Sequence, residues 1–324
     1  MDYFAEVHGI YSALALQENI PVDFVDEDGM QDTVKLAEFT TLFLTQPNVP
    51  AASVPVLVAW VKAGGTLVTT SNAAHWDEYD EPLAALQALG IHEVPRNRTL
   101  LGPFHHHHPP FPDGGGAAWQ KNGSAVDGAG YFAAWGATSS ARSTGPSTGR
   151  VHVLATFDDG TPATVENTVG SGRAVHFFWL PGVSHSYGGG GANCSGPCPW
   201  PGGAETGAAW SETRQTIGEM LAAATRREGD ATLLEHEPKQ ARVVTSEKWV
   251  ETPLLADNST GAVVTLLNWR GKPIPQLQLN VSLGFSPSKV VSVVHGPVVA
   301  AVGGDGMMSL SLSLEAADFI LFHK

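Results

Sequence analysis

The sequence predicts an α/β domain with a doubly wound, mainly parallel sheet, followed by a small all-β sandwich. Helical patterns alternate with short apolar strands over residues 1–230, which is typical of a parallel sheet with helical crossovers. Gly- and Pro-rich stretches near 99–150 and 187–207 interrupt this part and predict surface insertions. Residues 231–324 instead alternate with period two between turn sequences, which predicts the sandwich.

The first domain is organised around residues 58–74, VAWVKAGGTLVTTSNAA. Apolar residues at helical spacing around Trp60 predict a helix that ends at Gly64-Gly65. Thr66–Thr70 is a β-branched run, and we expect a strand buried on both faces. Ligands collect at the carboxyl ends of strands in open α/β sheets, so Ser71 is the first candidate for a functional residue.

Similar patterns predict the other elements of this domain. A helical period from Phe4 to Leu16 predicts a helix that stops near Asn19. The remaining expected elements are strands at Val22–Val25, Thr40–Thr45, Val151–Phe157 and Arg173–Leu180, a helix between Trp76 and Gly90, and a helix at about Glu212–Arg226.

The start of the sequence is unusual for a doubly wound domain, which ordinarily opens with its central strand. Here the first residues are already helical. This favours a lost first strand or the downstream part of a longer polypeptide over a fold that natively starts with a helix. Without that strand, Val22–Val25 and Thr40–Thr45 would lack a neighbour and leave a sheet edge or gap open to pairing.

The second domain is predicted to contain seven short strands separated by turn sequences. They are Ala241–Thr245, Trp249–Leu255, Ala262–Asn268, Gln276–Val281, Val290–Val294, Met308–Leu314 and Asp318–Phe322.

Composition limits the classes of partner. The 324 residues are 43% hydrophobic, enough for two cores, and carry 32 acidic against 18 basic residues, a net charge of -14. An acidic surface argues against nucleic acid and anionic membranes as partners. The sequence has no apolar run of membrane-spanning length and no signal-peptide pattern at its start, so we expect neither feature, while the cellular location stays open. Cys194 and Cys198 form a CxxxC pair without a second zinc-ligand pair, and a local disulfide and two free thiols remain alternatives.

Several motifs carry a resemblance to a known family. The central unit is followed by the acidic pair Asp77 and Glu78, and later by FDDGTPATVENTVGSGRAVHFFWLPG, VETPLL, VVTLLNWRGKPI and LSLSLEAADFILF. In this order they resemble the trimerisation domain and C-terminal β-sandwich of family 42 glycoside hydrolases, the β-galactosidases. The resemblance covers nearly the whole chain except the two Gly- and Pro-rich stretches. It implies a flavodoxin-like, class I glutamine-amidotransferase-like first domain.

The resemblance implies no glycosidase active site in this chain. In those β-galactosidases the two catalytic carboxylates lie in an upstream (β/α)₈ barrel, and this sequence contains no barrel. It therefore implies a non-catalytic protein that forms homo-oligomers, works with a glycosidase barrel on another chain, or associates with carbohydrate. We expect no cofactor.

The amidotransferase relationship gives a second hypothesis. In that fold the nucleophilic Cys sits in the strand-to-helix turn after a helix and a glycine pair, which is the place of Ser71 here. Ser replaces Cys and Ala73 replaces the usual glycine. The His-Pro-Glu of the family is also absent, because Arg173–Leu180 is followed by Pro181-Gly182, so glutamine hydrolysis is not expected.

A serine-dependent hydrolase of esters remains the alternative function. It needs a nucleophile, a base within hydrogen-bond reach and a group that orients the base. The candidate bases for Ser71 are His75 and His185, and the candidate orienting carboxylates are Asp77, Glu78 and Asp158. Each of these residues also has a purely structural interpretation, with Ser71 as a small turn residue and His185 as a loop residue.

Aromatic and histidine side chains supply the remaining candidates. Trp76, Trp179 and Tyr187 are candidates to line a site for a sugar ring, an ester or another small molecule, although such rings equally cover sheet edges. Four consecutive histidines, His105, His106, His107 and His108, cannot all ligate one tetrahedral ion, so we expect adventitious metal binding at most, or a solvated loop.

Overall fold

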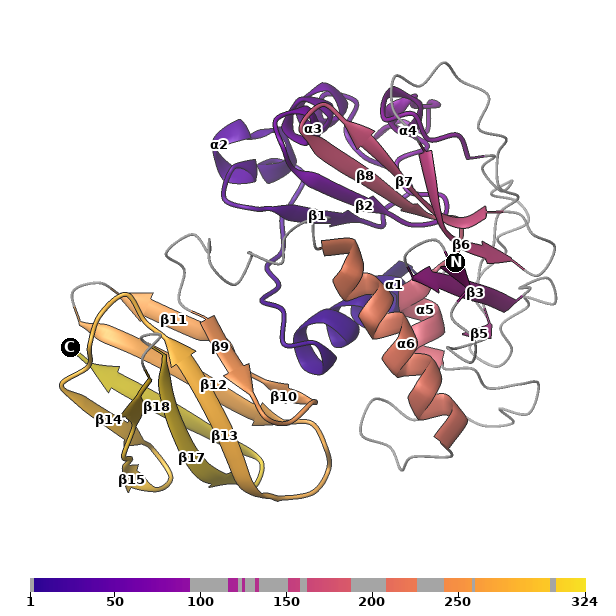
Figure 1. Ribbon diagram of the computed structural model, residues 1–324. Helices are drawn as coiled ribbons and strands as arrows, with labels where there is room; N and C mark the ends of the chain where they lie inside the picture. The colour runs from indigo at the N-terminus through magenta and orange to yellow at the C-terminus, as the bar shows by residue number, and fades with distance from the viewer. Residues whose placement is uncertain are drawn as a thin grey trace. The chain divides into compact units, whose positions relative to one another are not determined.

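The computed structural model describes residues 3–93, 116–121, 124–125, 132–133, 151–157, 162–187, 208–225, 242–257, 260–303 and 307–324. Their contacts divide the chain into two compact units. Unit 1 contains Met1–Tyr11, Asp23–Cys198 and Thr206–Thr225, and unit 2 contains Ser12–Val22, Pro199–Glu205 and Arg226–Lys324. Unit 1 is mixed α/β and unit 2 contains antiparallel sheets (Figure 1), so the expected order of an α/β part and an all-β part is confirmed.

Three parallel strands form one end of the sheet in unit 1. They are β1 (Thr41–Leu44), β2 (Thr66–Thr69) and β8 (Gly172–Phe177), with β2 between the other two. β2 is buried along its whole length, as its β-branched run predicted, and β8 is also buried throughout. Helices cover both sides of these strands (Figure 1). On one side lie α2 (Thr33–Leu36), α3 (Ser53–Lys62) and α4 (Ala85–Ala88), and on the other α1 (Tyr3–Tyr11), α5 (Pro181–Tyr187) and α6 (Ala208–Thr225).

The sheet is not mainly parallel, which corrects the sequence-based expectation. β8 is followed in the sheet by an antiparallel extension, in which β7 and β8 are joined by the two residues Gly170 and Ser171. Gly170 has φ +65°, and so short a connection joins antiparallel strands only. The strands of the extension are β7 (Pro162–Val169), β6 (Val151–Phe157), β3 (Gly116–Lys121) and β4 (Ser124–Ala125), with β5 (Phe132–Ala133) paired to β3.

Three local predictions also need correction. Val22–Val25 is irregular rather than a strand, because no described strand pairs with it. The expected helix between Trp76 and Gly90 is reduced to α4, since the Asp77 carboxylate accepts N–H bonds from Tyr79 and Glu81 and holds a turn. Helix α5 directly follows β8 where only a strand end was expected.

The central helix-turn-strand unit forms as predicted. Helix α3 buries Leu57 and Val61 in a core shared with Leu67 of β2. A Cβ on Gly65 would lie 2.5 Å from the Trp60 ring, so glycine is required for the chain to pass under the indole. Short helix η2 (Gly29–Gln31) and α2 complete this side, and the Asp32 carboxylate caps α2 through the N–H groups of Val34 and Lys35.

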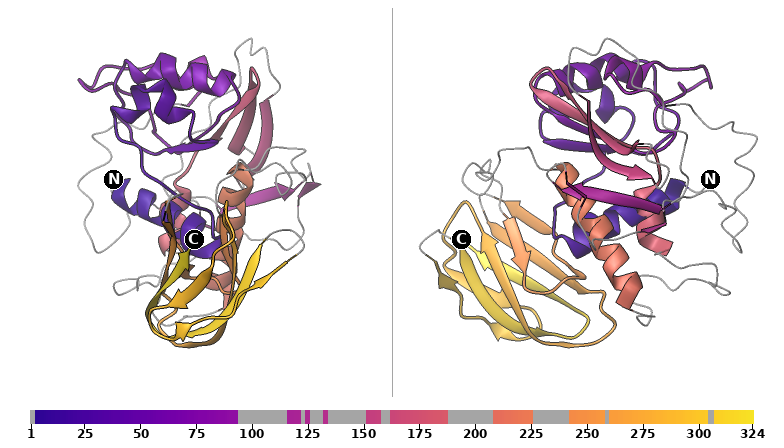
Figure 2. Two further views of the ribbon diagram at one scale, coloured as in Figure 1. Left: turned by 90° about the vertical axis from the view of Figure 1, so that its left-hand side faces the viewer. Right: turned by 45° about the vertical axis from the view of Figure 1, so that its right-hand side comes forward.

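Unit 2 is a sandwich of two antiparallel sheets (Figure 2). Strand β17 alternates strictly between buried and exposed residues, as expected for one face on a core. One sheet contains β10 (Val250–Glu251), β11 (Leu254–Asp257), β12 (Gly261–Asn268), β18 (Ala317–His323), β14 (Lys289–Ser292) and β15 (Gly296–Pro297); the other contains β16 (Ala301–Val302), β17 (Met308–Leu314), β13 (Ile274–Ser282) and β9 (Arg242–Thr245).

An N-terminal segment belongs to the sandwich unit by its contacts. Ser12–Val22, which includes the π-helix η1 (Ser12–Gln17), groups with unit 2 rather than with α1. The Trp249 N–H donates to the Leu16 carbonyl at 2.6 Å, and the Thr245 hydroxyl donates to the Asn19 side chain at 3.2 Å. The sequence-based boundary near residue 230 did not include this segment in the second domain.

Within the described residues, no helix is both long and apolar enough to cross a membrane. The same residues contain no group of three or more His, Cys, Asp or Glu side chains arranged to hold a metal ion. The histidines His105, His106, His107 and His108, together with Asp158, Cys194 and Cys198, lie outside the described residues.

Candidate functional site

The turn after β2 is buried and has an uncommon backbone conformation. Residues Ser71–Ala74 have almost no exposed surface. Asn72 has φ +64° and Ala74 has φ +54°, values that are unusual for residues other than glycine. The Ala74 N–H donates to the Gln46 carbonyl at 2.8 Å, which ties the turn to the residues after β1. The turn is therefore held in a costly conformation by its surroundings.

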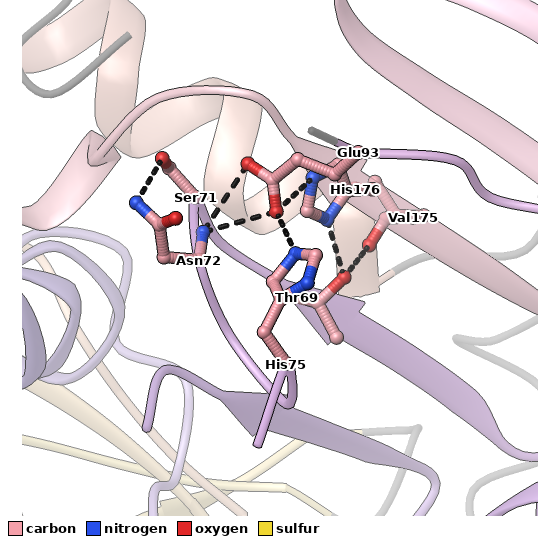
Figure 3. A network of polar contacts seen from close by, with 7 residues as sticks. All are labelled: Thr69, Ser71, Asn72, His75, Glu93, Val175 and His176. Atoms are coloured by element: carbon pink, nitrogen blue, oxygen red, sulfur yellow. Dashed lines mark hydrogen bonds and ion pairs between the residues drawn. The ribbon is translucent and has the colours of Figure 1, made fainter. Parts of the chain in front are cut away.

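The carboxylate of Glu93, whose side chain is buried, lies between two histidines beside this turn (Figure 3). Glu93 Oε2 is 2.7 Å from His75 Nε2 and 3.5 Å from His176 Nε2. The side chains of Glu93 and His176 have no exposed surface, and that of His75 is 11% exposed. Charges buried to this degree are stable only when they are paired and hydrogen-bonded.

Backbone and hydroxyl groups complete the polar network (Figure 3). The Asn72 N–H donates to both Glu93 oxygens, at 3.2 and 3.0 Å. The Thr69 hydroxyl lies 2.7 Å from His176 Nδ1 and 3.4 Å from the Val175 carbonyl. The network therefore links the ends of β2 and β8 to the segment that carries Glu93.

The electrostatics keep Glu93 ionised. Burial by itself would raise the pKa of the carboxyl, but the charges and hydrogen bonds of His176 and His75 outweigh burial and lower its pKa from 4.5 to about 2. The carboxylate is thus the fixed negative charge to which both imidazoles are held.

The structure places Ser71 at the edge of this network. Its hydroxyl accepts a bond from Asn72 Nδ2 at 3.3 Å, and its N–H donates to the Trp179 carbonyl at 3.3 Å. The hydroxyl belongs to a fully buried residue, so no substrate reaches it in this conformation. Ser71 lines neither the cleft of about 590 Å³ beside Phe24 and Lys35 nor the cleft of about 350 Å³ beside Phe285 and Met308.

The predicted base His185 lies on α5 and is fully buried. Burial, with the charges of Arg214 and His8, lowers its pKa from 6.5 to about 3, so it is neutral at pH 7. Arg214 of α6 donates to the carbonyls of His185 and Ser186, at 2.9 and 3.2 Å. A guanidinium therefore caps the C-terminal end of α5.

The other predicted catalytic carboxylates bind backbone groups. Asp77 accepts the N–H bonds of its own turn, and Glu78 accepts the Ala51 N–H at 2.8 Å. The carboxylate that actually orients His75 is Glu93, which sequence reasoning missed. The usable signal was His176, a polar residue inside the buried run RAVHFFWL, because a buried imidazole requires a polar partner.

The predicted aromatic binding residues differ in exposure. Trp179 is fully buried, its indole N–H donates to the Thr164 hydroxyl at 3.2 Å, and its ring meets Phe177 edge-on. The Trp76 ring lies 5.6 Å from the His75 ring. Tyr187 ends α5, and its side chain is outside the described part.

A second buried carboxylate, Glu6, joins α1 to α5. Its Oε2 accepts the Val183 N–H at 2.7 Å, at the N-terminal end of α5. Burial outweighs this bond and a second one from the Gly182 backbone, and raises the pKa of Glu6 from 4.5 to about 8. Its Oε1 has no hydrogen-bond partner among the described residues.

Substitution of Gly182 tests the close packing of these helices. A Cβ on Gly182 would lie 2.0 Å from the Glu6 carbonyl oxygen, and a Cβ on Gly9 would lie 1.9 Å from the Gly182 carbonyl oxygen. Because backbone must move, we expect Gly182→Ala to lower the free energy of unfolding by about 2 kcal/mol, measured by urea denaturation. Gly284→Ala, where a Cβ meets nothing within 4 Å, is the matched control. Equal stability of the two variants would contradict this packing.

Comparison with known proteins identifies the class of fold. No protein-family model matches the chain, and no curated protein sequence matches it. The structure, however, has the fold of part of a family 42 glycoside hydrolase, the class of the β-galactosidases.

Three solved structures illustrate this likeness. The β-galactosidase from Bacillus circulans sp. alkalophilus gives a TM-score of 0.57 at 16% identity, covering 100% of this chain and 38% of that chain. The β-galactosidase from Rahnella sp. R3 gives 0.52 at 14% identity, covering 100% and 37%. The α-L-fucosidase isoenzyme 2 from Paenibacillus thiaminolyticus gives 0.51 at 13% identity, covering 96% and 44%. This chain thus spans less than half of each enzyme, and at such identities the likeness concerns the fold.

Proposed function

We propose that this chain is a non-catalytic, glycosidase-related protein that forms homo-oligomers and associates with carbohydrate. The observation that carries the proposal is the extent of the structural match, which includes nearly all of this chain but at most 44% of each of the three enzymes. In the sequence, the motifs that resemble the trimerisation domain come before those that resemble the C-terminal sandwich, which is the order in the family 42 enzymes. Besides further copies of this chain, the partner that this proposal implies is a glycosidase barrel.

The polar geometry of unit 1 supports a structural use of the candidate residues. His75 is paired with Glu93, and Glu93 is shared with His176 and the Asn72 N–H. A catalytic base needs access to a substrate proton. A histidine held by a buried carboxylate next to a buried serine serves first to fix the turn.

A serine-dependent ester hydrolase is the second candidate. The observation in its favour is the turn itself, in which Asn72 and Ala74 have positive φ next to Ser71. Strained turns of this kind position nucleophiles in several hydrolases. In this candidate the catalytic residues are Ser71 and His75 or His185, and an opening of the turn has to precede the reaction.

One experiment separates the two candidates. The purified chain and Ser71→Ala are assayed with p-nitrophenyl β-galactoside and short-chain p-nitrophenyl esters, and their masses are measured by light scattering. We expect no turnover above background by either protein and a mass of more than one copy for both. Ester turnover that disappears in Ser71→Ala, with an unchanged circular dichroism spectrum, would establish the hydrolase instead. A monomer without turnover would contradict the oligomer proposal.

A further inference from the structure

Trp269, in the connection from β12 to β13, is a large apolar side chain that the sandwich leaves open to solvent. Its residue is 47% exposed, although most aromatic surface is buried in folded proteins. Exposure alone has no functional meaning. The contacts around the indole, however, show that it is held in one place.

Two hydrogen bonds fix the Trp269 residue. Its indole N–H donates to Glu251 Oε2 at 3.0 Å, and its backbone N–H donates to the Trp249 carbonyl at 2.9 Å. Trp249 itself has φ +64°, rare for a bulky residue, and its N–H donates to the Leu16 carbonyl at 2.6 Å. The ring is thus anchored at both its backbone and its polar edge.

The turn that carries Trp269 is equally well defined. Asn268 Nδ2 donates to the carbonyls of Lys272 and Glu315, at 2.8 and 2.6 Å, and Asn268 Oδ1 accepts the Arg270 N–H at 3.0 Å. Gly271 supplies the positive φ of +69° that closes the turn. A side chain presented on such a turn loses little further freedom when a ligand binds.

Charged side chains belong to the indole's hydrogen-bond partner and to the residue that follows Trp269 in the turn. Glu251 orients the ring, and Arg270 forms an ion pair with Glu247. The guanidinium has five N–H donors, and a carboxylate has several acceptor positions, so both can serve a ligand while they keep their present partners.

A pyranose ring matches this combination of groups. One face of a hexopyranose presents C–H groups that stack on the flat, electron-rich face of an indole, and its edge presents hydroxyls to carboxylates and guanidinium groups. The net charge of -14 disfavours an anionic saccharide. We propose that Trp269 is the stacking platform of a binding site for neutral pyranose units on unit 2, with Glu251 as the residue that positions the indole. This deepens the carbohydrate association of the proposed function and rests on it.

Affinity electrophoresis of the full chain tests the site. Gels contain no polysaccharide or one of three neutral probes, β-1,4-galactan, glucomannan and mixed-linkage β-glucan, with anionic polygalacturonate for comparison. We expect retardation by at least one neutral probe and not by polygalacturonate. Trp269→Ala should raise the dissociation constant at least tenfold, Trp269→Phe less, and Glu251→Ala severalfold with Trp269 still in place.

Phe319→Ala is the matched control, because Phe319 is an aromatic residue of the same unit that is 45% exposed. It should bind like the unchanged chain, and circular dichroism should show every variant folded. Absence of retardation by all neutral probes, equal binding by Trp269→Ala, or an equal loss in Phe319→Ala would each overturn the site.

The mass in solution, read together with the binding assay, distinguishes failure of the Trp269 site from failure of the proposed function. Retardation that is insensitive to Trp269→Ala overturns this site but leaves carbohydrate association standing. A monomeric mass in light scattering, together with binding that depends on Trp269, overturns the oligomer proposal but leaves the binding site standing.

Discussion

Glu93→Gln should lower the free energy of unfolding at pH 7 by about 3 kcal/mol. The pKa of Glu93 falls from 4.5 to about 2 because His176 and His75 together outweigh its burial. A carboxyl whose pKa is lower in the folded protein contributes stability that is complete above pH 4.5 and is lost as the pH falls towards 2. Glutamine keeps the size of the side chain but removes the charge that both imidazoles require.

Urea denaturation between pH 2 and pH 7 measures this effect. The difference in free energy of unfolding between the unchanged chain and Glu93→Gln should be largest at neutral pH. It should disappear as the pH falls from 4.5 to about 2. Glu38→Gln is the control, because Glu38 is an exposed partner of Lys35 and such pairs contribute little. A gap that stays constant down to pH 2 would show that the charge of Glu93 is not what stabilises the turn.

Glu6→Gln should have the opposite pH signature. The pKa of Glu6 rises from 4.5 to about 8 because burial outweighs the N–H bonds of α5. The folded chain therefore holds a proton that the unfolded chain releases above pH 4.5, and stability falls as the pH rises from 4.5 to 8. A neutral amide needs no proton, so the variant should gain about 3 kcal/mol relative to the unchanged chain between pH 5 and pH 8.

The same denaturation series at pH 5, 6, 7 and 8 measures this gain, and the comparison cancels the contribution of His185, which both proteins contain. Glu93→Gln should show no such trend above pH 5, since its carboxyl is ionised there in both states. Parallel stability curves for Glu6→Gln and the unchanged chain would mean that Glu6 is ionised in the fold.

Much of the architecture follows from local sequence patterns. The strands β1, β2, β6 and β8, helices α3 and α6 and the main strands of the sandwich lie where periodicity and turn residues predicted them. Mistakes occurred where a distant contact decides. Val22–Val25 has the apolar pattern of a strand but no partner strand among the described residues. The antiparallel part of the sheet was missed for a different reason, because the local hairpin turn at Gly170-Ser171 was not recognised.

The candidate site was only partly predictable. The turn at Ser71 was found because it follows a buried strand. Glu93 was missed because its role arises from the meeting of His75 and His176, which are far apart in the sequence. Burial of Ser71 and Trp179 is likewise a tertiary property that no spacing of residues reveals. The catalytic assignments of Ser71, His75 and His185 therefore stay predictions.

The membership of Ser12–Val22 in unit 2 has a consequence for modular exchange. Since the chain passes into the sandwich at Ser12 and leaves it at Asp23, the sandwich is assembled from pieces that are distant in the gene. A recombination event that moved only the coding region of residues 231–324 would leave behind the Leu16 carbonyl to which Trp249 is anchored. The two units are therefore expected to be inherited together, and a transplanted sandwich would need the N-terminal segment supplied alongside it.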